Sequence, residues 1–282
     1  MIFLLLSIVC SVSVAHLFKY ADGRTLPTFG LLAVNYVVGL GVALLGDGRE
    51  FFQKLSLPLI ILGVIIGVLF VCNYLLMILT IKKLGVTIPV SLMRLSAVLP
   101  TFGSIIFFAE LPSILQVGGI LLAFLSLPLA SEERIVFSNF VQIMDNGFGW
   151  GLMLFFIFGI ANFIFKIQRE SFPLDNPYHF LALIFLTAFL VSASVAIRQK
   201  TQITKTVLGF GAVLGILNLF ASYFLMKALQ SLPGIVVYPT NGIGIILLSA
   251  ITSLILWKER LKKSNYGFIA LASIALLLIY PR

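Results

Sequence analysis

The stretch that decides the fold is Asn73-Tyr74-Leu75-Leu76-Met77, because it returns 149 residues later as Ser222-Tyr223-Phe224-Leu225-Met226. At the same offset Glu110 corresponds to Glu259. Polar and charged matches at the ends of apolar runs are better evidence of a repeat than matching leucines, which an apolar chain produces by chance. The sequence therefore predicts two copies of one structural unit.

The composition places this repeat in a membrane. The chain has 282 residues, of which 60% are hydrophobic and 10% charged, and its mean hydropathy is +1.14. A soluble domain is typically about 45–50% apolar and about 25% charged. The composition excludes a disordered chain, a coiled coil and a disulfide scaffold, and it indicates lipid as the solvent.

Ten apolar runs are separated by short polar or turn-forming connectors. They cover residues 1–19, 28–46, 57–80, 85–109, 111–130, 147–166, 178–197, 206–229, 234–256 and 264–280. The runs are too long for buried strands and lack the alternation of an outer-membrane barrel. Only a helix satisfies its own backbone in hydrocarbon, so the predicted fold is an all-α membrane protein with ten transmembrane helices.

The repeat divides these helices into two halves of five. The first repeat covers residues 1–130, the second covers 147–280, and 131–146 is a connecting loop. Because five is odd, the second half must enter the membrane from the opposite side. The predicted repeats are therefore inverted, which is the pattern of many secondary transporters. A duplicated bundle without a transport role is the alternative.

The distribution of charged residues indicates membrane topology and does not indicate nucleic-acid binding. The net charge is +9, and most basic residues lie in connectors without interleaved aromatics. Twelve basic residues follow odd-numbered runs and six follow even-numbered runs, which favours both termini outside the cytoplasm. The run from Met1 to Phe18 has no preceding basic residue and no cleavage site, so we interpret it as a retained first span.

Arg94 is the most informative single residue. It lies near the middle of the fourth apolar run, between Pro89 and Pro100. A guanidinium at that depth costs at least about 2.5–3.5 kcal/mol on insertion scales and cannot be neutralised. No Asp or Glu lies at comparable depth in any run. We expect Arg94 to bind a carboxylate or phosphate of the substrate, and the alternative is a buried arginine bonded to carbonyls of another helix.

Polar side chains in other runs complete the predicted substrate site. Tyr238 and Asn241 share a face of the ninth run, which corresponds to the run of Arg94 in the second half. The full set of predicted substrate-binding residues is Arg94, Asn241, Asn73, Asn218, Tyr238, Tyr74 and Tyr223. Helix–helix hydrogen bonding is the alternative role of each asparagine, and core packing that of each tyrosine.

We predict roles other than substrate binding for the titratable residues near the ends of the runs. His16 is the candidate for proton coupling, with a hydrogen-bonded structural histidine as the alternative. We expect His179 at the membrane interface, and Lys166 and Lys227 extending their ammonium groups toward water. Glu110 and Glu259 are expected to cap a helix or to pair with Lys258, Arg260 or Lys262.

The sequence lacks the motifs of an enzyme. It has no nucleotide-binding loop, no His-Glu-x-x-His and no Gly-x-Ser-x-Gly. Cys10 and Cys72 lie in apolar runs and form no metal or disulfide pattern. We therefore expect no enzymatic activity, no cofactor and no metal site.

Motifs at the ends of the fourth and ninth runs resemble a known family. They are Phe107-Phe108-Ala109-Glu110 and Leu256-Trp257-Lys258-Glu259-Arg260-Leu261, with Gly118 and Gly267 eight residues after each glutamate. Together with the stretch from Pro89 to Pro100, the pattern resembles the ten-helix EamA-like branch of the drug/metabolite transporter superfamily. The resemblance implies a secondary transporter of small metabolites without an ATPase. It also implies termini in the cytoplasm, contrary to the charge count.

The predicted function is secondary active transport of a small polar or anionic metabolite by alternating access. An amino-acid-like substrate and export rather than import fit the resemblance. The predicted partners are this substrate and membrane lipids, without nucleic acid, and the sequence fits a monomer in a bacterial inner membrane. Two alternatives stay open, an integral membrane enzyme acting on a lipid-linked substrate and a non-transporting membrane assembly subunit.

Overall fold

A computed structural model describes residues 1–22, 26–47, 56–84, 87–130, 148–173, 175–256 and 263–280. Throughout these ranges the regular structure is helical, without strands. The elements are α1 (Ile2–Asp22), α2 (Thr28–Asp47), α3 (Leu57–Leu84), α4 (Thr87–Leu95), α5 (Val98–Phe108), α6 (Ile114–Ala130), α8 (Phe148–Ser171), α9 (Pro177–Arg198), α10 (Lys205–Ser231), α11 (Gly234–Leu256) and α12 (Lys263–Ile279). The loop predicted at 131–146 lies outside the described residues.

The helices are long and apolar enough for a membrane protein. Within the described ranges, seven segments qualify as spans by length and composition, and α4 and α5 together form one of them. Three shorter apolar helices, Ile2–Leu17, Ile114–Ser126 and Tyr266–Ile279, accompany these seven. The prediction of an all-helical membrane protein is confirmed at this level.

Helix positions recur along the chain at nearly the offset read from the sequence. α2 and α9 begin at Thr28 and Pro177, which are 149 residues apart, and the starts of α3 and α10 differ by 148 residues.

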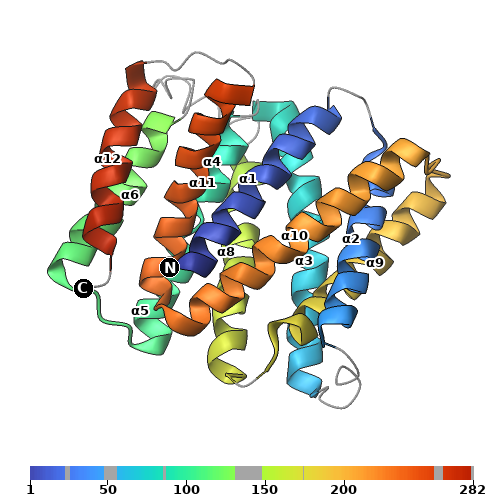
Figure 1. Ribbon diagram of the computed structural model, residues 1–282, viewed down its shortest axis with the longest axis horizontal. Helices are drawn as coiled ribbons and strands as arrows, with labels where there is room; N and C mark the ends of the chain where they lie inside the picture. The colour runs from blue at the N-terminus through green and yellow to red at the C-terminus, as the bar shows by residue number, and fades with distance from the viewer. Residues whose placement is uncertain are drawn as a thin grey trace. The chain divides into compact units, whose positions relative to one another are not determined.

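The chain folds into two compact units that do not follow its two sequential halves. Unit 1 comprises Met1–Val71 and Ile167–Gln230, and unit 2 comprises Cys72–Lys166 and Ser231–Arg282. Each unit therefore takes helices from both halves. α2 packs along α9 in unit 1, and α6 packs along α12 in unit 2, so these corresponding helices are spatial neighbours (Figure 1).

Glycines bring the helices of unit 1 close together. Gly63 and Gly67 of α3 face α9, where a Cβ on Gly67 would lie 2.7 Å from the carbonyl oxygen of Ile184. Gly211 and Gly215 of α10 face α2 in the same way. Small residues permit such backbone approach in membrane proteins, where packing replaces the hydrophobic effect between helices.

Unit 2 is built around α11. Val236 and Ile243 of α11 pack with Ile120 of α6 and with Phe268 and Ala272 of α12 in one buried apolar cluster. α11 contacts α4, α5, α6 and α12, and it contains Pro239 in its interior. This helix therefore positions the polar residues described next.

Candidate functional site

The fourth predicted span is interrupted directly after Arg94. α4 ends at Leu95, Ser96 and Ala97 form a turn, and α5 begins at Val98. In an unbroken helix the carbonyl of Ser96 would accept the N–H of residue 100, but Pro100 has none. Leu99 N–H donates to that carbonyl instead, at 3.0 Å. The span is therefore interrupted at 96–97, and Pro89 and Pro100 each lie in the first turn of the helix that contains them.

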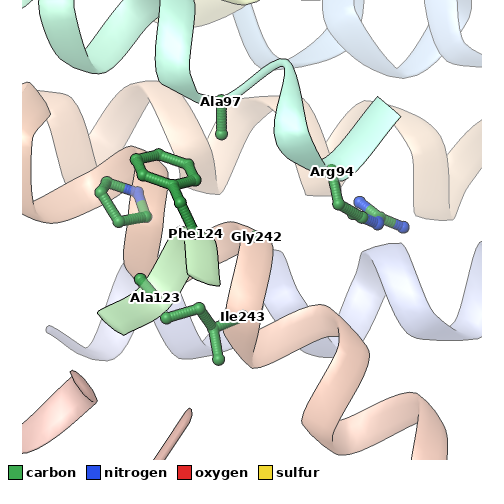
Figure 2. A pocket seen from close by; sticks show the side chains of 7 residues that line it. Arg94, Ala97, Ala123, Phe124, Gly242 and Ile243 are labelled. Carbon is green, nitrogen blue, oxygen red and sulfur yellow. The ribbon is translucent and has the colours of Figure 1, made fainter. Parts of the chain in front are cut away.

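A small pocket lies beside this break. Its walls come from α4, the turn, α6 and α11, and all belong to unit 2. The lining residues are Arg94, Ala97, Ala123, Phe124, Pro239, Gly242 and Ile243 (Figure 2). In this conformation the pocket has no room for a molecule of the size of water or larger, whereas sites for small molecules typically measure about 300–1,000 Å³.

Arg94 occupies the last turn of α4 and is half-buried. Its side chain extends away from Phe124, Ala123 and Ile243, as Figure 2 shows. No hydrogen bond or ion pair joins its guanidinium to another described residue. A cation in the last helical turn is favoured by the helix dipole, but this does not replace the hydrogen bonds that five N–H donors require.

Two of the predicted asparagines carry buried oxygen atoms without donors. Asn241 Oδ1 on α11 and Asn73 Oδ1 on α3 are buried and have no hydrogen-bond partner within the described structure. Asn73 is 8% exposed, and Asn241 directly precedes Gly242 of the pocket wall. Both lie in unit 2, as does Arg94. Buried polar atoms are almost always satisfied, so these oxygens are candidates for contacts with a bound molecule or with water.

Tyr238 is also in unit 2, but its hydroxyl is already engaged. The Tyr238 O–H donates to the carbonyl oxygen of Asn162 on α8 at 2.9 Å, and the ring is 3% exposed. Tyr74, on the part of α3 in unit 2, is half-buried and has an interaction partner. In this conformation both tyrosines therefore interact with other residues of the chain.

The remaining predicted site residues lie in unit 1. Asn218 on α10 and His16 on α1 are half-buried, and His16 has an interaction partner. Tyr223 stacks on Tyr178 of α9 with ring centroids 4.3 Å apart. Lys227 Nζ lies 5.9 Å from the centroid of the Tyr223 ring. The predicted site residues are thus divided between the two units. Arg94 and the two asparagines with unsatisfied oxygens are in unit 2.

One interpretation of a titratable residue was wrong. Lys166 does not extend toward water, since it is 2% exposed and its Nζ lies 2.6 Å from Glu110 Oε1. His179 is buried near the start of α9, with Nε2 buried, and its position at the membrane interface stays a prediction. In contrast, Glu110 caps a helix as expected, because its carboxylate accepts the N–H groups of Gly234 and Ile235 at the start of α11.

The described residues hold no group of three or more His, Cys, Asp or Glu side chains arranged for a metal ion. The candidate residues of unit 2 offer the guanidinium of Arg94 and the amide groups of Asn73 and Asn241. Such groups bind and orient a polar molecule by charge and hydrogen bonds.

Comparison with known proteins adds information on the fold. No family model matches the chain. An uncharacterized protein of Haemophilus influenzae is 27% identical, with 98% of this chain and 97% of that protein aligned. A solved structure described as "Crystal structure of protein" superposes with a TM-score of 0.80 at 14% identity, covering 99% of this chain and 95% of that one. At this identity the likeness concerns the fold alone, and it extends over nearly the whole chain.

Proposed function

We propose that this protein is a secondary active transporter of a small polar or anionic metabolite, with ten spans in two inverted five-helix repeats. Membership in the EamA-like branch of the drug/metabolite transporters is part of the proposal. The single observation that carries it is Arg94, a cation in a broken span that has no partner among the described residues. Such residues are rare in spans, where they mark substrate or ion pathways.

The helix break beside Arg94 supports the same role. Transporters typically place substrates at interrupted helices, where the backbone can leave its regular pattern only because it lines a cavity. The nearly constant offset between corresponding helices supports the repeat, because two similar five-helix units can exchange their packing. Alternate packings of the repeats then open the site to each side of the membrane.

The site chemistry favours a substrate with an anionic group and a hydrogen-bond donor. Arg94 receives the carboxylate or phosphate, and the oxygens of Asn73 and Asn241 accept from an ammonium or hydroxyl group. An amino-acid-like molecule carries both groups, and export is the favoured direction. Asn218, Tyr238, Tyr74 and Tyr223 orient the substrate or form walls, and His16 is the candidate for proton coupling.

A ligand-induced thermal-shift screen of the detergent-purified protein tests this proposal. The ligands are amino acids, organic acids, sugar phosphates, sugars and nucleosides. We expect anionic or zwitterionic ligands to raise the Tm of the wild type, because binding to the native state adds stability. The shift is lost in Arg94→Ala and kept in Arg198→Ala, which removes an exposed arginine at the end of α9.

Two results contradict the proposal. A shift that persists in Arg94→Ala shows that the arginine does not bind the ligand. A shift caused by lipid-linked molecules alone favours the membrane enzyme that the sequence left open.

A further inference from the structure

Unit 2 contains a second polar cluster, which joins three of its helices and does not include Arg94. Glu110, in the connector between α5 and α6, accepts Gly234 N–H through Oε1 and Ile235 N–H through Oε2, each at 2.9 Å. The same carboxylate pairs with Lys166 of α8 at 2.6 Å. We call Glu110, Lys166 and the first turn of α11 the latch. One side chain thus fastens α5, α8 and α11 together.

The local backbone is arranged to present this carboxylate. Ala109 has the left-handed conformation with φ 52°, which a residue with a Cβ adopts only at a cost of about 1–2 kcal/mol. The N–H groups of Ala109 and Glu110 both point to the carbonyl of Ser104, which closes the end of α5. Strained backbone of this kind persists where the surrounding structure fixes it, often at functional positions.

The other members of the latch are equally constrained. A Cβ on Gly234 would collide with Ser104 Oγ, so a larger residue at this position would require Ser104 to change rotamer. The Lys166 side chain is 3% exposed, and its Nζ lies 5.5 Å from the centroid of the Phe108 ring. An ammonium held in such surroundings depends strongly on the carboxylate beside it.

The latch also lies where the chain passes between units. The chain leaves unit 2 directly after Lys166 and returns to it at Ser231, three residues before Gly234. The latch therefore joins, inside unit 2, the two segments from which the chain continues into unit 1. The pocket residue Gly242 follows Gly234 on the same helix by eight residues, which is about 12 Å of α-helix.

We propose that the latch is a gate: it holds α11 against α5 and α8 in the closed conformation, and its release opens the pocket beside Arg94. Loss of the Glu110 charge weakens two bonds to the α11 N-terminus and the ion pair to α8 at the same time. The start of α11 then separates from α5, and Gly242 moves away from Ala97. The use of this opening in transport rests on the proposed function, whereas the opening itself does not.

Cysteine labelling tests the gate without any substrate. The reporter is Ala97→Cys, a pocket-lining position, in a chain with Cys10→Ala and Cys72→Ala. The rate of reaction with N-ethylmaleimide is measured in detergent for the parent and for Glu110→Gln, which keeps the shape of the side chain. The matched control is Glu170→Gln, which removes an exposed carboxylate of α8.

We expect Glu110→Gln to raise the labelling rate at least about tenfold, through a larger open population, and Glu170→Gln to leave it unchanged. The double variant Glu110→Gln/Lys166→Met leaves no unpaired buried charge, and it keeps the test valid if the single variant fails to fold. It is also expected to label faster than the parent.

A second reporter separates gating from general loosening. Ala43→Cys on α2 in unit 1 is 0% exposed and is expected to stay unreactive in the Glu110 variants. The proposal is overturned if the folded variants label Ala97→Cys at the parent rate. It is also overturned if Ala43→Cys accelerates to the same degree. Because no ligand is present, these outcomes are independent of whether the protein is a transporter.

Discussion

Removal of either partner of the buried Glu110–Lys166 ion pair should strongly destabilise the protein, while removal of both should cost less than the sum. The side chains are 12% and 3% exposed, and the charged atoms are 2.6 Å apart. At an effective dielectric constant of about 20, the gross attraction at this distance is about 6 kcal/mol. Desolvation offsets much of it, so the pair itself adds little net stability.

The single variants Glu110→Gln and Lys166→Met each leave one buried charge without its partner, which costs about 3–5 kcal/mol. In the double variant both charges are gone. The Gln side chain offers one carbonyl oxygen to the two N–H groups of α11, so a cost of about 1–3 kcal/mol remains for the second N–H. The expected coupling energy is therefore several kcal/mol, far above the value for an exposed pair.

The assay is equilibrium unfolding in mixed micelles of a mild detergent and sodium dodecyl sulfate, followed by far-UV circular dichroism. Glu170→Gln is the control, and as an exposed substitution it should change the free energy of unfolding by less than about 0.5 kcal/mol. Additive effects of the two single substitutions, or single costs below about 1 kcal/mol, would refute this reasoning because exposed pairs behave that way.

Three further predictions concern helix packing, backbone strain and a hydrogen bond. Gly67→Ala should destabilise by about 1–3 kcal/mol because the new Cβ would lie 2.7 Å from the carbonyl oxygen of Ile184, whereas Gly41→Ala, with nothing within 4 Å, should be neutral or stabilising in the same unfolding assay. Ala109→Gly should raise the free energy of unfolding by up to about 1 kcal/mol, since glycine adopts a positive φ without strain, and a loss of stability would contradict the backbone argument. Tyr238→Phe should cost about 0.6 kcal/mol through its lost bond to the α8 backbone, a small drop that unfolding of the variant beside the wild type would detect.

The positions of the helices could be predicted because, in the hydrocarbon core of a membrane, an apolar run satisfies its backbone hydrogen bonds by forming a helix. The runs predicted at 28–46 and 234–256 correspond to α2 (Thr28–Asp47) and α11 (Gly234–Leu256). Hydropathy and the spacing of polar connectors are sufficient for this, since an unpaired backbone group in hydrocarbon costs several kcal/mol. The assignment of helices to compact units was not predictable in the same way, because it depends on contacts between segments far apart in the sequence.

In the site too, features that depend on neighbouring residues in the sequence could be predicted, whereas contacts between distant residues could not. Arg94 was identifiable because a guanidinium inside an apolar run is a local anomaly. The position of the break at 96–97 was not predicted. It follows from Pro100, which has no N–H to donate to the carbonyl four residues earlier.

The environment of Lys166 was missed for the opposite reason. Its partner Glu110 lies 56 residues away in sequence, and the identity of neither residue indicates that they meet. A lysine near the end of an apolar run is usually interfacial. The sequence offered one signal. Glu110 and the glycine at the start of α11 both have counterparts at the 149-residue offset, but this match does not show that Glu110 pairs with Lys166.

The binding of a transported substrate's anionic group by Arg94 can be measured by counterflow in proteoliposomes. The ligand with the largest thermal shift is used as the labelled substrate with wild type, Arg94→Lys and Arg94→Ala. We expect strong exchange in the wild type, reduced exchange in Arg94→Lys, which keeps the charge but loses the planar fork, and a loss of at least about a hundredfold in Arg94→Ala. Wild-type exchange by Arg94→Ala would contradict this expectation.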